Sequence, residues 1–136
     1  MSQVRERVPP QNIEAEEAVI GSMLIEQNAV ITALEILKPE DFYKENHRII
    51  FNQIAEMADK LEAVDLVTLA ENLKSAGQLE KIGGAAELAR LANFVPTAAN
   101  VEYYAKIVAE KAVLRRLIAV STEIAASAYD SQYEVD

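Results

Sequence analysis

The sequence predicts an all-α protein, in which a globular head of short helices is followed by one much longer helix. Ala, Leu, Ile, Glu and Lys are abundant, and most of them favour helix. The 136 residues include only 4 glycines and 4 prolines, so loops are expected to be few. Apolar side chains recur at intervals of three and four, the spacing of one helix face. The length suits one domain with a substantial core.

The first 11 residues are expected to form an extended arm, because Pro9 and Pro10 keep this segment out of helix. Asn12 is a suitable N-cap for the first helix. Three acidic residues in its first turns suit the positive end of the helix dipole; they are Glu14, Glu16 and Glu17. The inward stripe of this helix consists of Val19, Ile20, Met23 and Leu24. The predicted head begins here and spans residues 12–99.

Four further helices complete the predicted head. The second spans about 29–37 and is ended by Pro39. The third lies within 39–60, and its inward side chains are Ile49, Ile50, Ile54 and Met57. The fourth begins after Asp65, a candidate N-cap, and ends at Gly77, a candidate C′ residue. The fifth follows Gly83 and Gly84, and its apolar side chains are Leu88, Leu91 and Phe94.

The long sixth helix is expected over residues 100–130, after a break at "VPTAAN". One apolar stripe follows steps of four and three like a heptad seam, interrupted twice; it consists of Tyr103, Ile107, Glu110, Leu114, Leu117, Ser121, Ile124 and Ala128. A second stripe runs nearly opposite and consists of Val101, Tyr104, Ala105, Val108, Ala112, Ala119 and Ala126. A helix with two apolar faces needs two partners. It is either the buried centre of a bundle or, as we prefer, a hairpin arm that associates with another chain.

Composition narrows the classes of partner. The net charge of −9 makes the isolated chain a poor binder of nucleic acid, because phosphate contacts need Lys and Arg. The absence of cysteine excludes a disulfide scaffold and a Cys-ligated zinc site. No apolar run approaches the ~20 residues that span a bilayer, and the start "MSQVRERVPPQ" lacks a signal-peptide core. We therefore expect a cytoplasmic protein with protein partners or no partner, and with no membrane contact.

The glycine pair Gly83–Gly84 raises the question of a phosphate site, since free backbone N–H groups at a helix start bind anions. A P-loop needs Gly-x-x-x-x-Gly-Lys-Ser/Thr after a strand, and no such string is present. The preceding "QLEKI" is too short and charged for the strand of a dinucleotide fingerprint. The pair is therefore interpreted as a helix-start turn that uses the conformational freedom of glycine.

The sequence also lacks the side-chain patterns that are typical of catalytic and metal-binding sites. His47 is the only histidine, and no Glu-x-x-His pair accompanies it, so we expect a partly buried polar residue on the third helix. The three glutamates of the first helix are expected to match its dipole and to make surface contacts, because the dipole opposes the raised pKa of a general acid. The sequence predicts no catalytic, cofactor-binding or metal-binding residue in this chain.

A set of motifs resembles the N-terminal domain of bacterial replicative DNA helicases of the DnaB type. The motifs occur in family order over nearly the whole chain: "RVPPQNIEAEEAVIG", "PEDFY", "H..IF", "VDLVTLAE", "LEKIGG", "VPTAANVEYYAKIV" and "VLRRLIAVSTEIA". The resemblance implies a six-helix-type globular head followed by a long helix that is the first arm of a helical hairpin. Residues 131–136 would then be a turn and the truncated start of the second arm.

The resemblance also implies a function. In the family, hairpins pair two protomers, and three pairs build a collar that stacks on a ring of ATPase domains. The collar receives the C-terminal helicase-binding domain of primase, and a helicase loader is a further possible partner. ATP and magnesium are expected only for the missing motor domain, and DNA is expected to bind only weakly through this part.

Partner positions carry over where the motifs match. Glu14 matches an acidic head position implicated in primase communication, and Ile118 and Ile124 match apolar hairpin positions with the same role. Arg115 and Arg116 match the "LRRLI" pair. Together with side chains of the long helix, the expected partner and oligomer interface comprises Glu14, Tyr103, Tyr104, Ile107, Leu114, Arg115, Arg116, Leu117, Ile118 and Ile124. Glu87 stands where relatives often carry an aromatic residue, which puts a head contact there in doubt.

Two other classes of protein are alternatives. A free-standing helical adaptor unrelated to replication would have a reading frame that ends near residue 136, whereas a helicase would continue into a P-loop domain. An enzyme comes third, because no constellation of side chains supports it.

Overall fold

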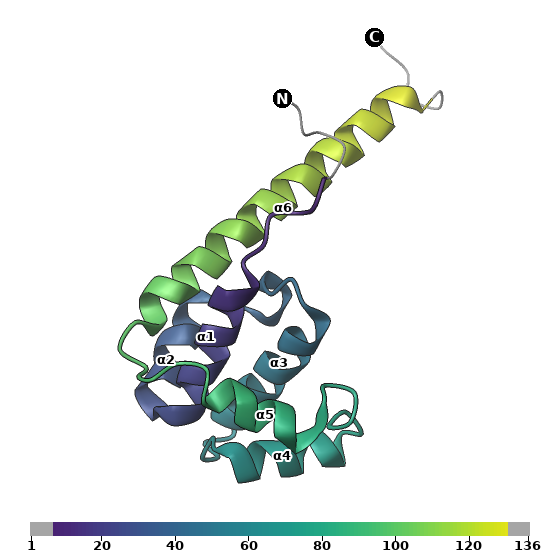
Figure 1. The fold of residues 1–136 in the computed structure, drawn as a ribbon. Helices are drawn as coiled ribbons and strands as arrows, with labels where there is room; N and C mark the ends of the chain where they lie inside the picture. The colour runs from purple at the N-terminus through teal and green to yellow at the C-terminus, as the bar shows by residue number, and fades with distance from the viewer. Residues whose placement is uncertain (1–6, 131–136) are drawn as a thin grey trace.

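The computed structural model describes residues 7–130, and all regular structure in that range is helical. The elements are α1 (Ile13–Ile25), α2 (Gln27–Ile36), the 3-10 turn η1 (Pro39–Asp41), α3 (Glu45–Asp59), α4 (Leu66–Ser75), α5 (Gly84–Ala92) and α6 (Val101–Tyr129). Helices α1 to α5 and the first half of α6 form a compact head, and the second half of α6 extends away from it (Figure 1). The predicted turn at 131–136 and the first six residues of the predicted arm lie outside the described range.

Helix α1 is the centre of the head, and α2, α3, α5 and α6 all pack against it. The predicted N-cap is confirmed, because the Asn12 side chain accepts a hydrogen bond of 2.9 Å from the Ala15 N–H. The predicted inward stripe is buried, but so is every other residue from Ala15 to Leu24. Small residues permit this close packing: a Cβ at Gly21 would collide with the carbonyl oxygen of Leu91 on α5.

The second and third helices differ from the prediction at their ends. Helix α2 begins at Gln27, two residues earlier than predicted. The segment from Pro39 makes only a 3-10 turn, and α3 begins at Glu45. Phe42 separates the two elements; its extended backbone places its ring in the core, 4.8 Å from the Phe51 ring centroid. Phe51 was missing from the predicted inward face.

The inward face of α3 is otherwise largely as predicted. Ile50, Ile54 and Met57 are buried, whereas Ile49 is half-buried and packs at the edge of the core. The face is rotated toward Phe51 because that ring pairs with Phe42.

The ends of α4 and α5 follow the predicted capping chemistry. The Asp65 carboxylate accepts from the Thr68 N–H at 2.9 Å, while the Thr68 hydroxyl accepts from the Asp65 N–H at 3.0 Å. Gly77 has φ +72°, and the N–H of the following residue donates to the Leu73 carbonyl, which closes a Schellman motif. Gly83 and Gly84 have φ +108° and +78°, so the glycine pair is the helix-start turn that was predicted.

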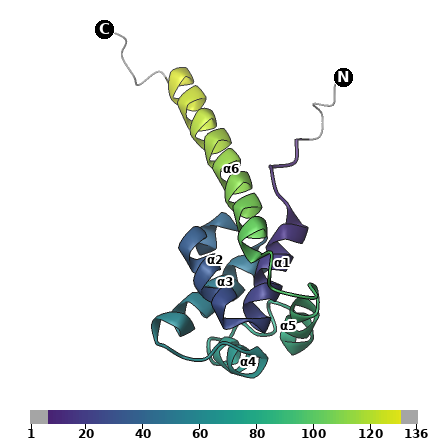
Figure 2. The ribbon, with the colours of Figure 1, turned by 90° about the vertical axis from the view of Figure 1, so that its left-hand side faces the viewer.

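Helix α6 packs on the head only along its first half. Its buried residues are Val101, Ala105, Val108 and Ala112, and it contacts α1 and α2 through them. From Val113 to Tyr129 nearly every residue is exposed. In a second view, this half of α6 again leaves the head with no other helix beside it (Figure 2).

Candidate partner interface

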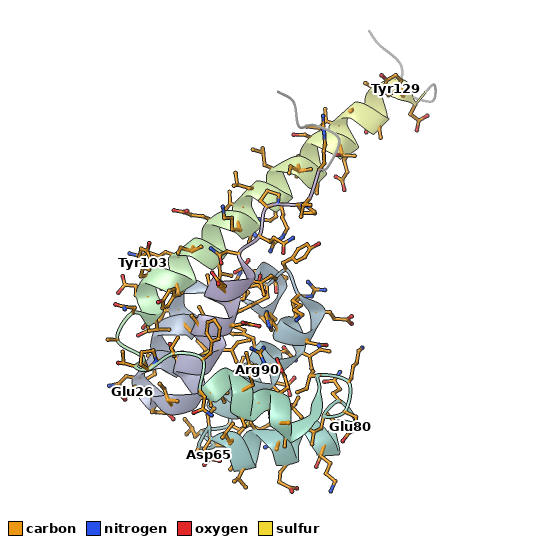
Figure 3. All side chains as sticks on the ribbon, in the orientation of Figure 1. Glu26, Asp65, Glu80, Arg90, Tyr103 and Tyr129 are labelled. Carbon is orange, nitrogen blue, oxygen red and sulfur yellow. The ribbon has the colours of Figure 1, made fainter. Side chains whose placement is uncertain are left out.

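The free half of α6 carries the largest group of exposed apolar side chains in the described chain. Six of them are 43–65% exposed: Val113, Leu114, Leu117, Ile118, Val120 and Ile124. Side chains stand out from this half of the helix into open space, from the level of the head to the labelled Tyr129 at its end (Figure 3). A contiguous exposed apolar surface of this kind marks an interaction site in a soluble protein.

The two predicted stripes of α6 have different environments. The second stripe supplies the four buried residues that pack on the head. Most of the heptad-like stripe faces outward, with Tyr103 66% and Leu117 60% exposed, although Ile107 packs at the edge of the core. Within residues 7–130 the head therefore covers mainly the first half of the second stripe. This arrangement is that of a projecting arm, and it differs from the buried central helix of a bundle.

A shallow pocket of about 290 Å³ lies where α1, the end of α5 and the start of α6 meet, and three predicted interface residues line it. Glu14 is exposed at its edge, and Tyr104 and Ile107 are half-buried beside it. Phe94, also in the lining, was predicted as an apolar residue of the fifth helix; it lies just beyond the end of α5 and is 38% exposed. The structure thus brings Glu14 next to the first turns of α6, far from the exposed side chains at Ile118 and Ile124.

The two arginines of the "LRRLI" pair make different contacts. Arg115 is half-buried and binds the head: it donates to the Pro10 carbonyl at 2.8 Å and to the Asp41 carbonyl at 2.6 Å. Its guanidinium carbon lies 5.5 Å from the centroid of the Tyr43 ring. Arg116 makes one ion pair of 3.3 Å with the Asp41 carboxylate, and its side chain is 62% exposed.

The prediction of a surface role for the first-helix glutamates is correct for Glu14 only. Glu16 is 1% exposed, and it accepts from the Tyr43 N–H at 2.6 Å and from His47 Nδ1 at 2.7 Å. His47 is likewise 1% exposed, so the expectation of partial burial is wrong. Because a carboxylate has no hydrogen to donate, the ring donates through Nδ1. A buried polar group needs such partners to offset its lost hydration.

The sequence contained a signal for this buried pair. Glu16 precedes Ile20 and Met23 by four and seven residues, and His47 precedes Ile50, Phe51 and Ile54 by three, four and seven. These intervals place each polar residue on the apolar face of its own helix. The periodicity should have had precedence over the helix-dipole argument.

Glu17 is also buried, and its carboxylate pairs with Arg90 of α5 at 2.8 Å. The Arg90 guanidinium also donates to both carboxylate oxygens of Glu87, at 2.9 and 2.7 Å. The hydrogen bond from Arg90 lowers the pKa of Glu87, and the two carboxylates together raise the pKa of Arg90. Glu87, the residue that departs from the family pattern, is thus held by an intramolecular contact.

No group of three or more His, Asp or Glu side chains within residues 7–130 is arranged to hold a metal ion. In the same range, no helix combines the length and apolar character that a membrane span requires.

A model of the DnaB-like helicase N-terminal domain matches residues 8–110. The chain belongs to this family. The DnaB-like chain is 53% identical over 131 residues to the replicative DNA helicase DnaB of Geobacillus stearothermophilus, with 96% of the chain covered. It is 48% identical over 133 residues to the replicative DNA helicase DnaC of Bacillus subtilis, with 98% covered. In both cases the alignment spans 29% of the relative's length.

Solved structures agree with the DnaB-like fold. The N-terminal domain of DnaB helicase from Mycobacterium tuberculosis superposes with a TM-score of 0.88 at 43% identity, covering 92% of this chain and 91% of that one. A DnaB-like replicative helicase, whose structure was described together with its interactions with primase, superposes with a TM-score of 0.75 at 27% identity. That match covers 85% of this chain and 27% of the other. The all-α fold and the predicted family are both confirmed.

Proposed function

We propose that this chain is the assembly and primase-docking region of a hexameric replicative DNA helicase. In this proposal the region pairs two protomers, and three pairs form the collar of the ring. The unwinding of duplex DNA with ATP and magnesium belongs to a motor domain in the remaining length of the relatives. In this proposal the region has no catalytic role of its own, and its net charge of −9 allows only weak contact with DNA.

The uncovered half of α6 is the observation that carries this proposal. Fully burying a Leu, Ile or Val side chain is worth roughly 1.5–3 kcal/mol. The six apolar side chains from Val113 to Ile124 are about half exposed, so each has roughly 1 kcal/mol still to gain. Their sum, roughly 6 kcal/mol per chain, exceeds the lower bound of ~4 kcal/mol for the cost of association. The expected product is a weak, concentration-dependent dimer.

Sedimentation of the wild-type chain and two variants tests the pairing. Leu117→Asp places a charge in the middle of the outward stripe and should give a monomer with unchanged helicity. Ala119→Asp adds the same charge about 160° around the helix from Leu117 and about 100° from Ile118, at 3.6 residues per turn, and it should still dimerise. A wild-type chain that stays monomeric up to millimolar concentration would refute the pairing.

Primase docking is proposed because a DnaB-like replicative helicase similar to this chain was solved with its interactions with primase. Ile118 and Ile124 are 52% and 65% exposed and are available to a partner. In the full-length hexamer, Ile118→Ala and Ile124→Ala should weaken binding of the primase C-terminal domain. Glu123→Ala, which lies about 140° and 100° around the helix from these two residues, should not. If the affinity is unchanged in both isoleucine variants while the hexamer is intact, this part of the proposal is wrong. A loader would be a separate partner, tested with the same variants.

A further inference from the structure

The segment Asp41–Lys44, between η1 and α3, is held by side chains from three helices. From α1, Glu16 accepts hydrogen bonds from the N–H groups of Tyr43 and Lys44, at 2.6 and 3.4 Å. From α3, Nη1 of Arg48 donates to the carbonyls of Phe42 and Tyr43, both at 2.8 Å. Phe42 and Lys44 in this segment have extended backbone, so these side chains take the place of regular helical hydrogen bonding.

This segment is anchored firmly in the core. The Phe42 ring is fully buried and packs on Phe51. Glu16, which accepts hydrogen bonds from the backbone of this segment, is 1% exposed, and its carboxylate is also bound by His47. Because charged acceptors form stronger hydrogen bonds than neutral ones, the carboxylate restrains the segment more than an amide or hydroxyl would.

The third helix that binds the segment is α6, through Arg115. Its two terminal nitrogens reach the Asp41 carbonyl and the Pro10 carbonyl, and the guanidinium lies over the Tyr43 ring. Arg115 is three residues beyond Ala112, the last buried residue of α6. Its contacts therefore lie outside the apolar contact between α6 and the head, toward the free end of the helix.

We propose that Arg115 is the positioning residue that fixes the direction in which α6 leaves the head. The apolar contact from Val101 to Ala112 holds α6 on α1 and α2, and helix pairs packed in this way vary in crossing angle by 15–20° or so. Arg115 adds a second support on a different part of the head, the Asp41–Lys44 segment. It also binds Pro10, which precedes α1, at the same place. Two supports on different elements restrict the rotation that one alone permits.

Arg116 provides a matched comparison, because it stands next to Arg115 and also reaches Asp41. It has a single ion pair of 3.3 Å, to a side chain and not to the backbone, and 62% of its own side chain is exposed. Exposed pairs of this kind contribute little. Arg115 instead uses a planar fork on two carbonyls and a ring face, a set of contacts that lysine cannot reproduce.

The direction of α6 can be measured with spin labels, since the chain has no cysteine of its own. Labels on Asp59→Cys at the end of α3 and Glu123→Cys on α6 report the distance between head and arm. Labelled protein is diluted in a large excess of unlabelled protein, so that only distances within one chain are recorded. This readout does not depend on dimerisation or on primase, and it remains informative if the proposed function is wrong.

The expected shift follows from helix geometry. Glu123 lies 11 residues beyond Ala112, or about 16 Å at 1.5 Å per residue. A rotation of about 10° at Ala112, within the usual scatter of packed helices, moves it by about 3 Å. Arg115→Gln should therefore broaden or displace the distance distribution by about 3 Å, and Arg115→Lys should do so partially. Arg116→Gln should match the wild type.

Circular dichroism of each variant shows whether the head is folded. A wild-type distribution in a folded Arg115→Gln protein would overturn the proposal, and so would equal broadening in Arg116→Gln. If Arg115→Gln unfolds the head, Arg115→Lys decides: a wild-type distribution there shows that the charge, and not the forked contact, is sufficient, and the proposal fails.

Discussion

Three glutamates within four residues of α1 lie in three different environments. Replacing each with glutamine should therefore change the free energy of unfolding by three different amounts. Glu14 is exposed, Glu17 is 9% exposed and paired with Arg90, and Glu16 is 1% exposed within the Tyr43–His47 contacts. Glutamine has the same shape as glutamate and removes only the charge and one acceptor oxygen. The series therefore tests the hydrogen bonding of each carboxylate at constant volume.

Glu16→Gln should destabilise the head more than the other two substitutions. Each oxygen of Glu16 accepts a hydrogen bond from a backbone N–H group, Oε2 from Tyr43 and Oε1 from Lys44, so the amide NH₂ must face a backbone donor whichever way it turns. The loss of a hydrogen bond to a charged acceptor costs about 1.5–3 kcal/mol, and a buried unsatisfied donor adds about 1–3 kcal/mol. We expect a decrease of about 3 kcal/mol or more in the free energy of unfolding, and a fall in Tm of roughly 10 °C.

The other two substitutions should cost much less. Glu14→Gln should change the free energy of unfolding by less than about 0.5 kcal/mol, as for most surface substitutions. Glu17→Gln should cost at most about 1 kcal/mol, because Arg90 is half-exposed and keeps Glu87 as a partner. Urea unfolding followed by circular dichroism measures all three. If Glu16→Gln and Glu14→Gln agree within about 0.5 kcal/mol, the buried pair does not stabilise the head as described.

Three further predictions concern single sites. Gly21→Ala should destabilise the head by about 1–3 kcal/mol in urea unfolding, because the added methyl group meets the Leu91 carbonyl. An unchanged unfolding midpoint would show that α1 and α5 can move apart at little cost. Leu61→Gly should stabilise the head by up to about 1 kcal/mol, because Leu61 has φ +60° and its side chain is 92% exposed. A loss of stability would show instead that the Leu61 side chain makes a stabilising contact. Arg90 lowers the pKa of Glu87 from its ordinary 4.5, so Glu87 stabilises the folded state above that value and the stabilisation disappears as pH falls through the lowered pKa. The difference in Tm between wild type and Glu87→Gln should therefore be largest near neutral pH and shrink below about pH 4.5, and a difference independent of pH would contradict the ion pair.

The sequence was sufficient for features that depend on local chemistry. The caps at Asn12 and Asp65 and the positive φ angles at Gly77 and Gly83 were predicted, because each depends on a few neighbouring residues. The extent of α6 was predicted within one residue, since no glycine or proline interrupts 29 residues of helix.

Features that depend on distant residues were predicted less well. Phe42 could not be recognised as a break between η1 and α3, because its ring is placed by Phe51 and the next residue, Tyr43, is held by Glu16, 27 residues earlier in the chain. The contacts of Arg115 were also missed: they join residues 74 and 105 positions apart, and the sequence indicated only a basic pair within the expected partner interface. The partner roles of the interface residues remain predictions, and the structure shows only that those beyond Ala112 are exposed, apart from the half-buried Arg115.

The central position of α1 has a consequence for the order of events during synthesis. This helix is translated first, yet α5 and α6, which cover much of its surface, come last, and about 75 residues separate Ile25 from Val101. At 5–20 residues per second, α1 waits roughly 4–15 s for those partners. During that interval its apolar faces are available to chaperones or to other nascent chains. The head is thus completed only when the beginning of α6 has emerged, so the helix that projects from the finished domain also closes its core.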